Sequence, residues 1–100
     1  MYGLATEDIH KITSVFKKHS SIEKAILYGS RATGNYRSNS DIDLTLVGKD
    51  LTLTELFDIE NELENLLLPY KIDLSVYDKI ENEDLRAQID KAGRAFYQQP

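Results

Sequence analysis

The sequence predicts an α/β (α+β) protein with one small mixed sheet of three or four strands flanked by helices. Two observations lead to this prediction. Apolar residues recur at helical spacing in three long segments, and short apolar or alternating runs lie between those segments. The two kinds of segment take turns along the chain, without repeats or a linker. One hundred residues of this kind are expected to form a single domain, 1–100.

The first elements are predicted from spacing and end signals. A helix is expected at 6–19, because its apolar residues have a helical period and Thr6 offers a capping hydroxyl. The apolar run 24–28 predicts a buried central strand. A short helical turn then starts at Ser30 and is closed by Gly34, since glycine is favoured where a helix ends.

The middle of the chain predicts two strands joined by a helix. Residues 41–47 and 71–77 alternate between apolar and polar side chains, as expected for strands with one buried face. Between them a helix begins at Thr52 or Thr54, either of which can cap it, and Pro69 stops it.

The final segment is predicted to be a helix. Asn82 is the candidate N-cap, and apolar residues at helical spacing continue to Phe96 or Tyr97. Gly93 would be a mild flaw inside this helix, since glycine in a helix costs roughly 1 kcal/mol relative to alanine.

Composition narrows the class of function. The net charge of −5, with scattered basic residues, disfavours nucleic acid as the main substrate. The chain has no cysteine, so disulfides and thiolate metal sites are excluded. The N-terminal residues do not resemble a secretory signal, and the apolar runs are too short to cross a membrane. A cytoplasmic location is therefore expected.

Three aspartates are the candidate catalytic and metal-binding residues. Asp41 and Asp43 lie two apart on one strand, so both project from the same face. Asp73 is on the polar face of the next predicted strand, and would lie beside them if these strands pair. Carboxylates held together favour a hard cation such as Mg²⁺. Three of them can hold two metal ions about 3.5–4 Å apart, an arrangement that promotes phosphoryl transfer.

The second candidate feature is a phosphate loop. Gly29 allows close approach of a phosphate to the backbone, and Ser30 starts a helical turn whose N–H groups can face an anion. Arg31 and Arg37 are candidates for charge-assisted contacts with phosphate oxygens. Each feature alone has an ordinary structural explanation, such as a helix cap, a polar strand face or surface ion pairs. Their combination in this order favours a functional site.

The run Gly-Ser-Arg-Ala-Thr-Gly-Asn-Tyr-Arg-Ser-Asn-Ser-Asp-Ile-Asp-Leu, residues 29–44, resembles the signature of the DNA polymerase β nucleotidyltransferase superfamily. It is most similar to the minimal nucleotidyltransferase (MNT) branch, whose members are single domains of about this size. The resemblance implies the nucleotidyltransferase fold. One departure is Thr33, where many relatives have a basic residue, and it leaves one phosphate or partner contact in question.

The resemblance also implies roles for residues. Asp41 and Asp43 would bind Mg²⁺, and Asp73 would complete the metal site and help to deprotonate the acceptor hydroxyl. Gly29 and Ser30 would hold the phosphates of ATP, the substrate, with support from Arg37 more than from Arg31.

Three functions follow from the resemblance. In the MNT branch the implied acceptor is a HEPN-domain toxin, whose tyrosine receives AMP (AMPylation), so that the chain would be an antitoxin. A nucleotidyltransferase acting on a small molecule, as in antibiotic-modifying relatives, is the second possibility. The third is an antitoxin that neutralises its toxin by binding alone. The absence of a domain that holds an acceptor counts against the second, and the intact aspartates count against the third.

Overall fold

The computed structural model describes residues 1–100 and contains one four-stranded sheet. The elements in chain order are α1 (Thr6–Lys17), β1 (Lys24–Tyr28), α2 (Ser30–Thr33), β2 (Ile42–Val47), α3 (Leu53–Glu64), β3 (Ile72–Val76), the 3₁₀ turn η1 (Tyr77–Lys79), α4 (Glu83–Ala92) and β4 (Arg94–Gln98). In the sheet order β3-β2-β1-β4, β1 is antiparallel to β2 and β4, and β2 is parallel to β3. This confirms the mixed sheet flanked by helices, with β1 in a central position as predicted.

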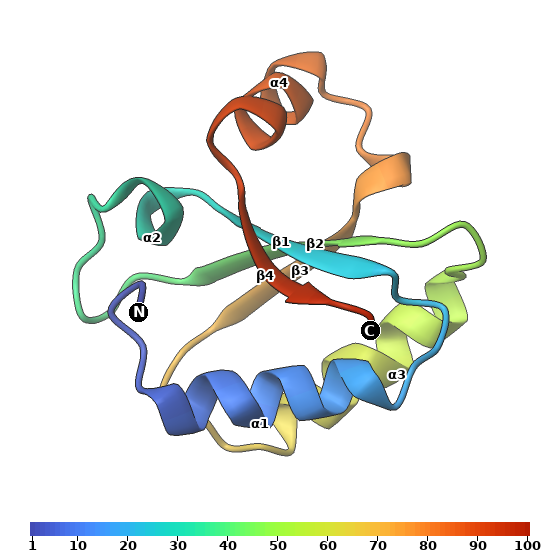
Figure 1. The fold of residues 1–100 in the computed structure, drawn as a ribbon, viewed down its shortest axis with the longest axis horizontal. Coiled ribbons are helices and arrows are strands. Elements are labelled where there is room, and N and C mark those ends of the chain that lie inside the picture. Colours follow the sequence, from blue (N-terminus) through green and yellow to red (C-terminus); the bar gives the residue numbers. More distant parts are fainter.

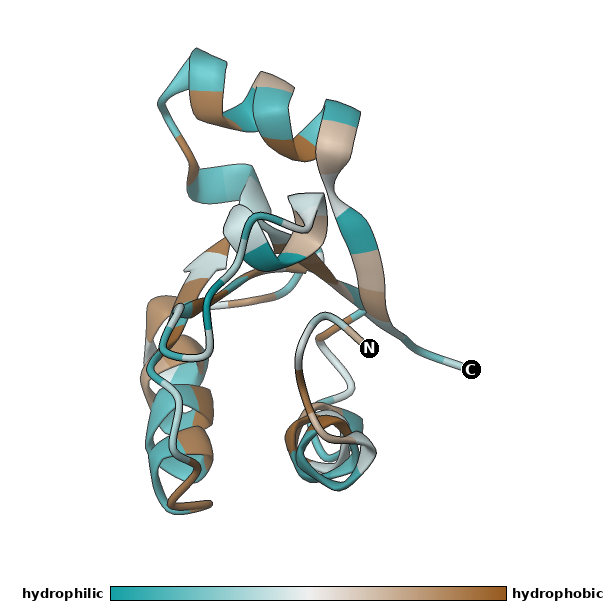
Figure 2. Ribbon diagram, turned by 90° about the vertical axis from the view of Figure 1, so that its left-hand side faces the viewer, coloured by the Kyte–Doolittle hydropathy of each residue, from teal (hydrophilic) through white to brown (hydrophobic).

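The two faces of the sheet differ in the side chains that they carry. Helices α1 and α3 lie on one side of it, and α2 and α4 lie on the other (Figures 1 and 2). On the α1/α3 side, Leu27, Leu44 and Leu74 form a row across three strands, and all three are buried. Because strand side chains alternate, the next row points to the α2/α4 side and consists of Tyr28, Asp43 and Asp73. The apolar core thus fixes which face carries the acidic residues.

Side-chain capping was predicted correctly for two of the three long helices. The hydroxyl of Thr52 accepts a hydrogen bond from the backbone N–H of Glu55, and the Asn82 side chain does the same for Leu85. The prediction for Thr6 was wrong, since Ala5 takes the N-cap position of α1 and no side chain caps that end. At 12 residues each, α1 and α3 are the longest helices, and no helix in the structure could span a bilayer.

The prediction of a helix reaching Phe96 or Tyr97 was also wrong. Helix α4 ends at Ala92, Gly93 is extended, and β4 follows and pairs with β1. The Tyr97 side chain is buried and its ring lies 5.7 Å from that of Phe16 on α1. Pairing with the free edge of β1 and burial of Tyr97 outweigh the helical spacing of this short segment, whose periodicity suits either structure. Gly93 therefore marks the boundary of the helix and is not a flaw inside it.

Candidate active site

The three aspartates come together at one end of two parallel strands. Asp43 on β2 and Asp73 on β3 are direct partners in the strand register, and Asp41 immediately precedes β2. The backbone N–H of Ile42 donates to the carbonyl of Lys71 at 2.9 Å, which fixes the start of β2 against β3. Asp43 is half-buried, while Asp41 and Asp73 are exposed. No lysine, arginine or histidine forms a salt bridge with any of the three.

The charges of these groups affect one another. Burial raises the pKa of the Asp43 carboxyl, and the neighbouring carboxylates of Asp73 and Asp41 raise the pKa further. Burial also raises the pKa of the Tyr28 hydroxyl, and the charges of Asp43 and Asp73 add to this. The site therefore holds negative charge that nothing in the chain neutralises.

The donor set fits a hard divalent cation. All three candidate ligands are carboxylates, and oxygen ligands without sulfur or imidazole suit Mg²⁺. In the structure no group of three acidic, histidine or cysteine side chains converges into a ready-made metal cage. This is compatible with Mg²⁺, which usually takes only one or two protein carboxylates and completes its shell with water and substrate phosphates.

Gly29 lies against Asp43 in a conformation that only glycine adopts readily. Its φ is +74° with ψ −157°, and a Cβ at this position would collide with Oδ2 of Asp43. Helix α2 starts at the next residue, Ser30, and is closed by Gly34 in the left-handed conformation, as predicted. The Gly-Ser step therefore lies directly beside the acidic residues. Phosphate binding by Gly29 and Ser30 remains a prediction.

Arg31 does not face this site. The residue is 2% exposed, and Cζ of its guanidinium lies 5.5 Å from the ring centroid of Tyr36 and 5.1 Å from that of Tyr70. Nε and Nη2 donate to the carbonyl of Ser40 at 3.1 and 2.8 Å. Nη2 also donates to the carbonyl of Ser38 at 3.4 Å, and Nη1 to that of Tyr2 at 3.0 Å.

The phosphate-binding role expected for Arg31 is therefore corrected. Its donors are used inside the protein, because the loop that leads to Asp41 turns its carbonyls of Ser38 and Ser40 toward the guanidinium. Arg31 holds this loop against the N-terminal segment. Arg37, by contrast, is exposed, and its side chain makes no hydrogen bond or salt bridge. Its guanidinium is free to contact a ligand.

Sequence reasoning missed two basic residues near α2. Lys91 and Arg94 line a hollow of about 500 Å³ together with Ala32 and Thr33. The sequence did not show that α4 ends at Ala92. Because it ends there, Lys91 and Arg94, on either side of Gly93, lie next to α2. Positive charge is thus available near Thr33, the position where the sequence departs from the MNT pattern.

Sequence reasoning also missed Tyr28 and the hydroxyls behind it. The sequence indicates Tyr28 only as the end of an apolar strand, whereas the register of β1 against β2 puts it in the row of Asp43. In the next row, Thr45 and Ser75 are partners, and their buried hydroxyl oxygens have no hydrogen-bond partner. Strand alternation is the signal that links these residues to the acidic face.

The fold matches several chains from solved toxin–antitoxin complexes. A chain of a toxin–antitoxin crystal structure with AMP-PNP is 22% identical and superposes with a TM-score of 0.73, covering 91% of this chain and 73% of that one. A chain of the complex between a tri-AMPylated Shewanella oneidensis HEPN toxin and an MNT antitoxin is 18% identical, with a TM-score of 0.69, covering 99% of this chain and 74% of that one. An MntA–HepT complex gives 18% identity and 0.69, covering 95% and 74%. At these identities the likeness establishes a shared fold.

The family model described as "Polymerase beta, Nucleotidyltransferase" matches residues 10–100. A comparison with curated proteins gives no significant match. The matched range includes the Gly-Ser step and all three aspartates, which the fold brings to one end of the sheet. The chain belongs to the polymerase β nucleotidyltransferase family.

Proposed function

We propose that this protein is a Mg²⁺-dependent nucleotidyltransferase that moves AMP from ATP to a tyrosine hydroxyl of a HEPN-domain toxin, and so acts as its antitoxin. The observation that carries the proposal is the strand register that places Asp43 opposite Asp73, with Asp41 two residues before Asp43. The family of the chain and its likeness to structures that contain AMP-PNP or an AMPylated HEPN toxin support it.

Asp41 and Asp43 are the proposed Mg²⁺ ligands, with Asp73 as the third carboxylate. When bound, Mg²⁺ neutralises phosphate charge and stabilises the leaving pyrophosphate. The protein itself contributes position, because Asp43 lies on β2 two residues after Asp41, and the pairing of β2 with β3 fixes Asp73 beside Asp43. Such positioning is the main contribution that proteins make to phosphoryl-type transfer.

The proposed reaction is an in-line displacement at the α-phosphorus of ATP. The oxygen of the acceptor hydroxyl attacks, a new bond from oxygen to phosphorus forms, and the bond to the bridging oxygen of the β-phosphate breaks, which releases pyrophosphate. The proton of the hydroxyl passes to the carboxylate of Asp73. Asp73 suits this role because it is exposed and lies on the edge strand of the sheet.

The phosphates of ATP are proposed to lie over the Gly29–Ser30 step. Gly29 brings the backbone close to Asp43, so phosphates there would be next to the proposed metal ligands. Arg37 is the proposed arginine contact, because its side chain is exposed and unpaired. Lys91 and Arg94 add positive charge beside α2.

The test is transfer of AMP to a HEPN-domain protein encoded in the adjacent reading frame. The two proteins are incubated with ATP and Mg²⁺, and the intact mass of the HEPN protein is measured. An increase by one or more AMP units is expected. An unmodified HEPN protein, under conditions where the pair binds, would contradict the enzymatic proposal.

A double variant separates catalysis from binding. Asp41→Ala with Asp43→Ala is expected to abolish the AMP adduct and, with it, neutralisation of the toxin in growing cells. If the variant forms no adduct but still neutralises the toxin, the protein acts by binding, and its enzymatic role as an antitoxin is wrong.

A further inference from the structure

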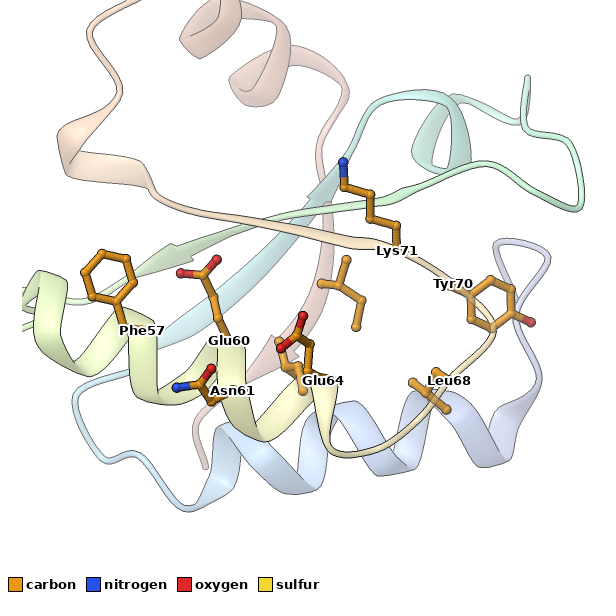
Figure 3. Close-up of a pocket in the computed structure, with 9 residues that line it drawn as sticks. Phe57, Glu60, Asn61, Glu64, Leu68, Tyr70 and Lys71 are labelled. Carbon is orange, nitrogen blue, oxygen red and sulfur yellow. The ribbon is translucent and has the colours of Figure 1, made fainter.

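The side of α3 that faces β3 forms an open groove of about 720 Å³ (Figure 3). Phe57, Glu60, Asn61 and Glu64 line it from one face of the helix, at the i, i+3, i+4 and i+7 positions. The remaining lining residues come from Leu63, from the segment that follows α3, and from the start of β3: Leu68, Tyr70, Lys71 and Ile72. The groove therefore combines an apolar lining with two carboxylates.

These two carboxylates lack a cationic partner. Helix α3 contains five acidic residues and no basic one. Two of them, Glu55 and Glu62, are paired with the two residues that follow α1: His19 contacts both, and Lys18 binds Glu62. Glu60 and Glu64 make no salt bridge, and the amine of Lys71 points away from them (Figure 3). The groove thus presents negative charge that the chain does not neutralise.

Apolar side chains are exposed beside these charges. Phe57 is 61% exposed in the groove, and Leu67, next to the lining residue Leu68, is 87% exposed. Leu67 also has a φ of +56°, which is uncommon for leucine. An apolar surface with unpaired carboxylates is complementary to a protein segment that carries apolar side chains and arginine or lysine.

The groove is next to the proposed catalytic base. Ile72 lines the groove, and Asp73 follows it on the opposite face of the same strand. Since β3 is an edge strand, no other strand lies between the groove and Asp73 on its outer side. A segment seated in the groove and crossing this edge would bring a neighbouring hydroxyl to Asp73.

We infer that the groove is the docking site for the acceptor protein, and that it binds a segment with apolar residues and at least one arginine or lysine. This inference rests on the proposed function, because it names the surface that the acceptor uses at the same site. It also assigns a surface to the acceptor, which no sequence motif indicated.

The experiment reverses the charge of the groove. Binding of the HEPN-domain protein from the adjacent reading frame is measured by calorimetry without ATP, for the wild type and for Glu60→Lys/Glu64→Lys. The variant is expected to bind at least about tenfold more weakly, because it removes attraction and adds repulsion. Its kcat at a saturating concentration of the HEPN protein stays near the wild-type value, while the KM for that protein rises.

A control pair and a further groove variant make the result specific. Asp50→Lys/Glu81→Lys makes the same change in net charge at two exposed positions outside the groove, and is expected to bind like the wild type. Phe57→Ser removes an exposed apolar side chain, so the fold is retained while binding weakens. Circular dichroism and thermal unfolding check that every variant is folded.

The outcomes test the docking site and the proposed AMP transfer independently. Unchanged binding of the groove variants, or equal weakening by the control pair, overturns the docking site. A self-association of this chain that only the groove variants abolish also overturns it, because the occupant is then a second copy. If groove variants weaken binding but the wild type transfers no AMP, the proposed reaction fails and the docking site stands. No binding by the wild type overturns both.

Discussion

Asp43 on β2 and Asp73 on β3 are direct partners across a parallel strand pair, so both side chains project from the same face, and no basic residue forms a salt bridge with either. Parallel strands need a crossover, and α3 provides it. Residues 44–72, which separate the two aspartates in sequence, therefore form the segment that brings them side by side.

Asp73→Asn is expected to lower AMP transfer by about 10²–10⁴-fold, because the amide cannot take the proton of the acceptor hydroxyl. The fold is expected to remain, since Asp73 is exposed and Asn has the same shape. Single-turnover transfer of AMP, followed by intact mass, checks this. Asp50→Asn, at an exposed loop position, is the control and keeps wild-type activity. Activity of Asp73→Asn within tenfold of the wild type would rule out Asp73 as the base.

Asp43→Asn is expected to stabilise the metal-free protein near neutral pH. The pKa of the folded Asp43 carboxyl lies above its ordinary value of 3.8, because of burial and the charges of Asp73 and Asp41. A raised carboxyl pKa means that the charged form is disfavoured in the folded state. The resulting loss of stability is absent below the unfolded pKa and grows as the pH rises through the folded pKa.

Urea unfolding in EDTA, from about pH 4 to about pH 8, measures this difference between Asp43→Asn and the wild type. The advantage of the variant is expected to grow with pH, and to shrink when Mg²⁺ is added, because the proposed ligand then gains a cation. A difference that stays constant with pH would show that the carboxyl is not under electrostatic strain.

Much of the fold could be predicted because local signals and tertiary packing agree. The alternation in 41–47 and 71–77 predicts both strands and the face that carries Asp43 and Asp73, and the structure confirms this. The end of α4 could not be predicted, since the segment after Gly93 satisfies either a helix or a strand pattern. The segment forms a strand because β1 has an open edge with which it can pair, and no local sequence pattern reveals that edge.

The sequence predicts those site residues whose spacing puts them on one strand face. It does not predict those whose role depends on whether the side chain is buried. Two aspartates two residues apart on a strand are expected to share a face. An arginine near a phosphate loop looks the same in the sequence whether its guanidinium binds a ligand or the protein's own carbonyls. The role of Arg31 depends on Tyr36 and Tyr70 around it. The sequence does not reveal the groove on α3 either, because it does not tell which acidic residues of α3 pair with Lys18 and His19.

Gly29→Ala is expected to abolish AMP transfer, while Gly34→Ala is not. Both glycines have positive φ, so each substitution costs stability, about 1–3 kcal/mol at Gly29 and about 1–2 kcal/mol at Gly34. Only at Gly29 would the new Cβ collide with the carboxylate of Asp43, since nothing lies within 4 Å of one at Gly34. The two variants therefore share backbone strain and differ in the displacement of Asp43.

Thermal unfolding and AMP transfer are measured for both glycine variants, at a temperature where both are folded. Loss of activity in Gly29→Ala alone supports the placement of Asp43 in the reaction. Equal loss in both variants would attribute the effect to α2 and its strain.

Arg31→Met is expected to lower the free energy of unfolding by about 3 kcal/mol, because it leaves the carbonyls of Tyr2, Ser38 and Ser40, in a partly buried site, without their donor. Arg31→Lys should rescue little of this, since a single ammonium cannot reproduce the planar fork of donors. Arg37→Met is the matched control and is expected to change stability by less than about 0.5 kcal/mol, because its side chain is exposed and unpaired.

The two arginines should also differ in kinetics. Arg37→Met is expected to raise the KM for ATP, since we propose that it contacts phosphate. Arg31→Met is expected to lower kcat for AMP transfer through the loop before Asp41. Urea unfolding and steady-state kinetics distinguish the roles. If Arg31→Met keeps the stability of the wild type and raises only the KM for ATP, the guanidinium leaves its buried position to bind nucleotide, and the structural role is wrong.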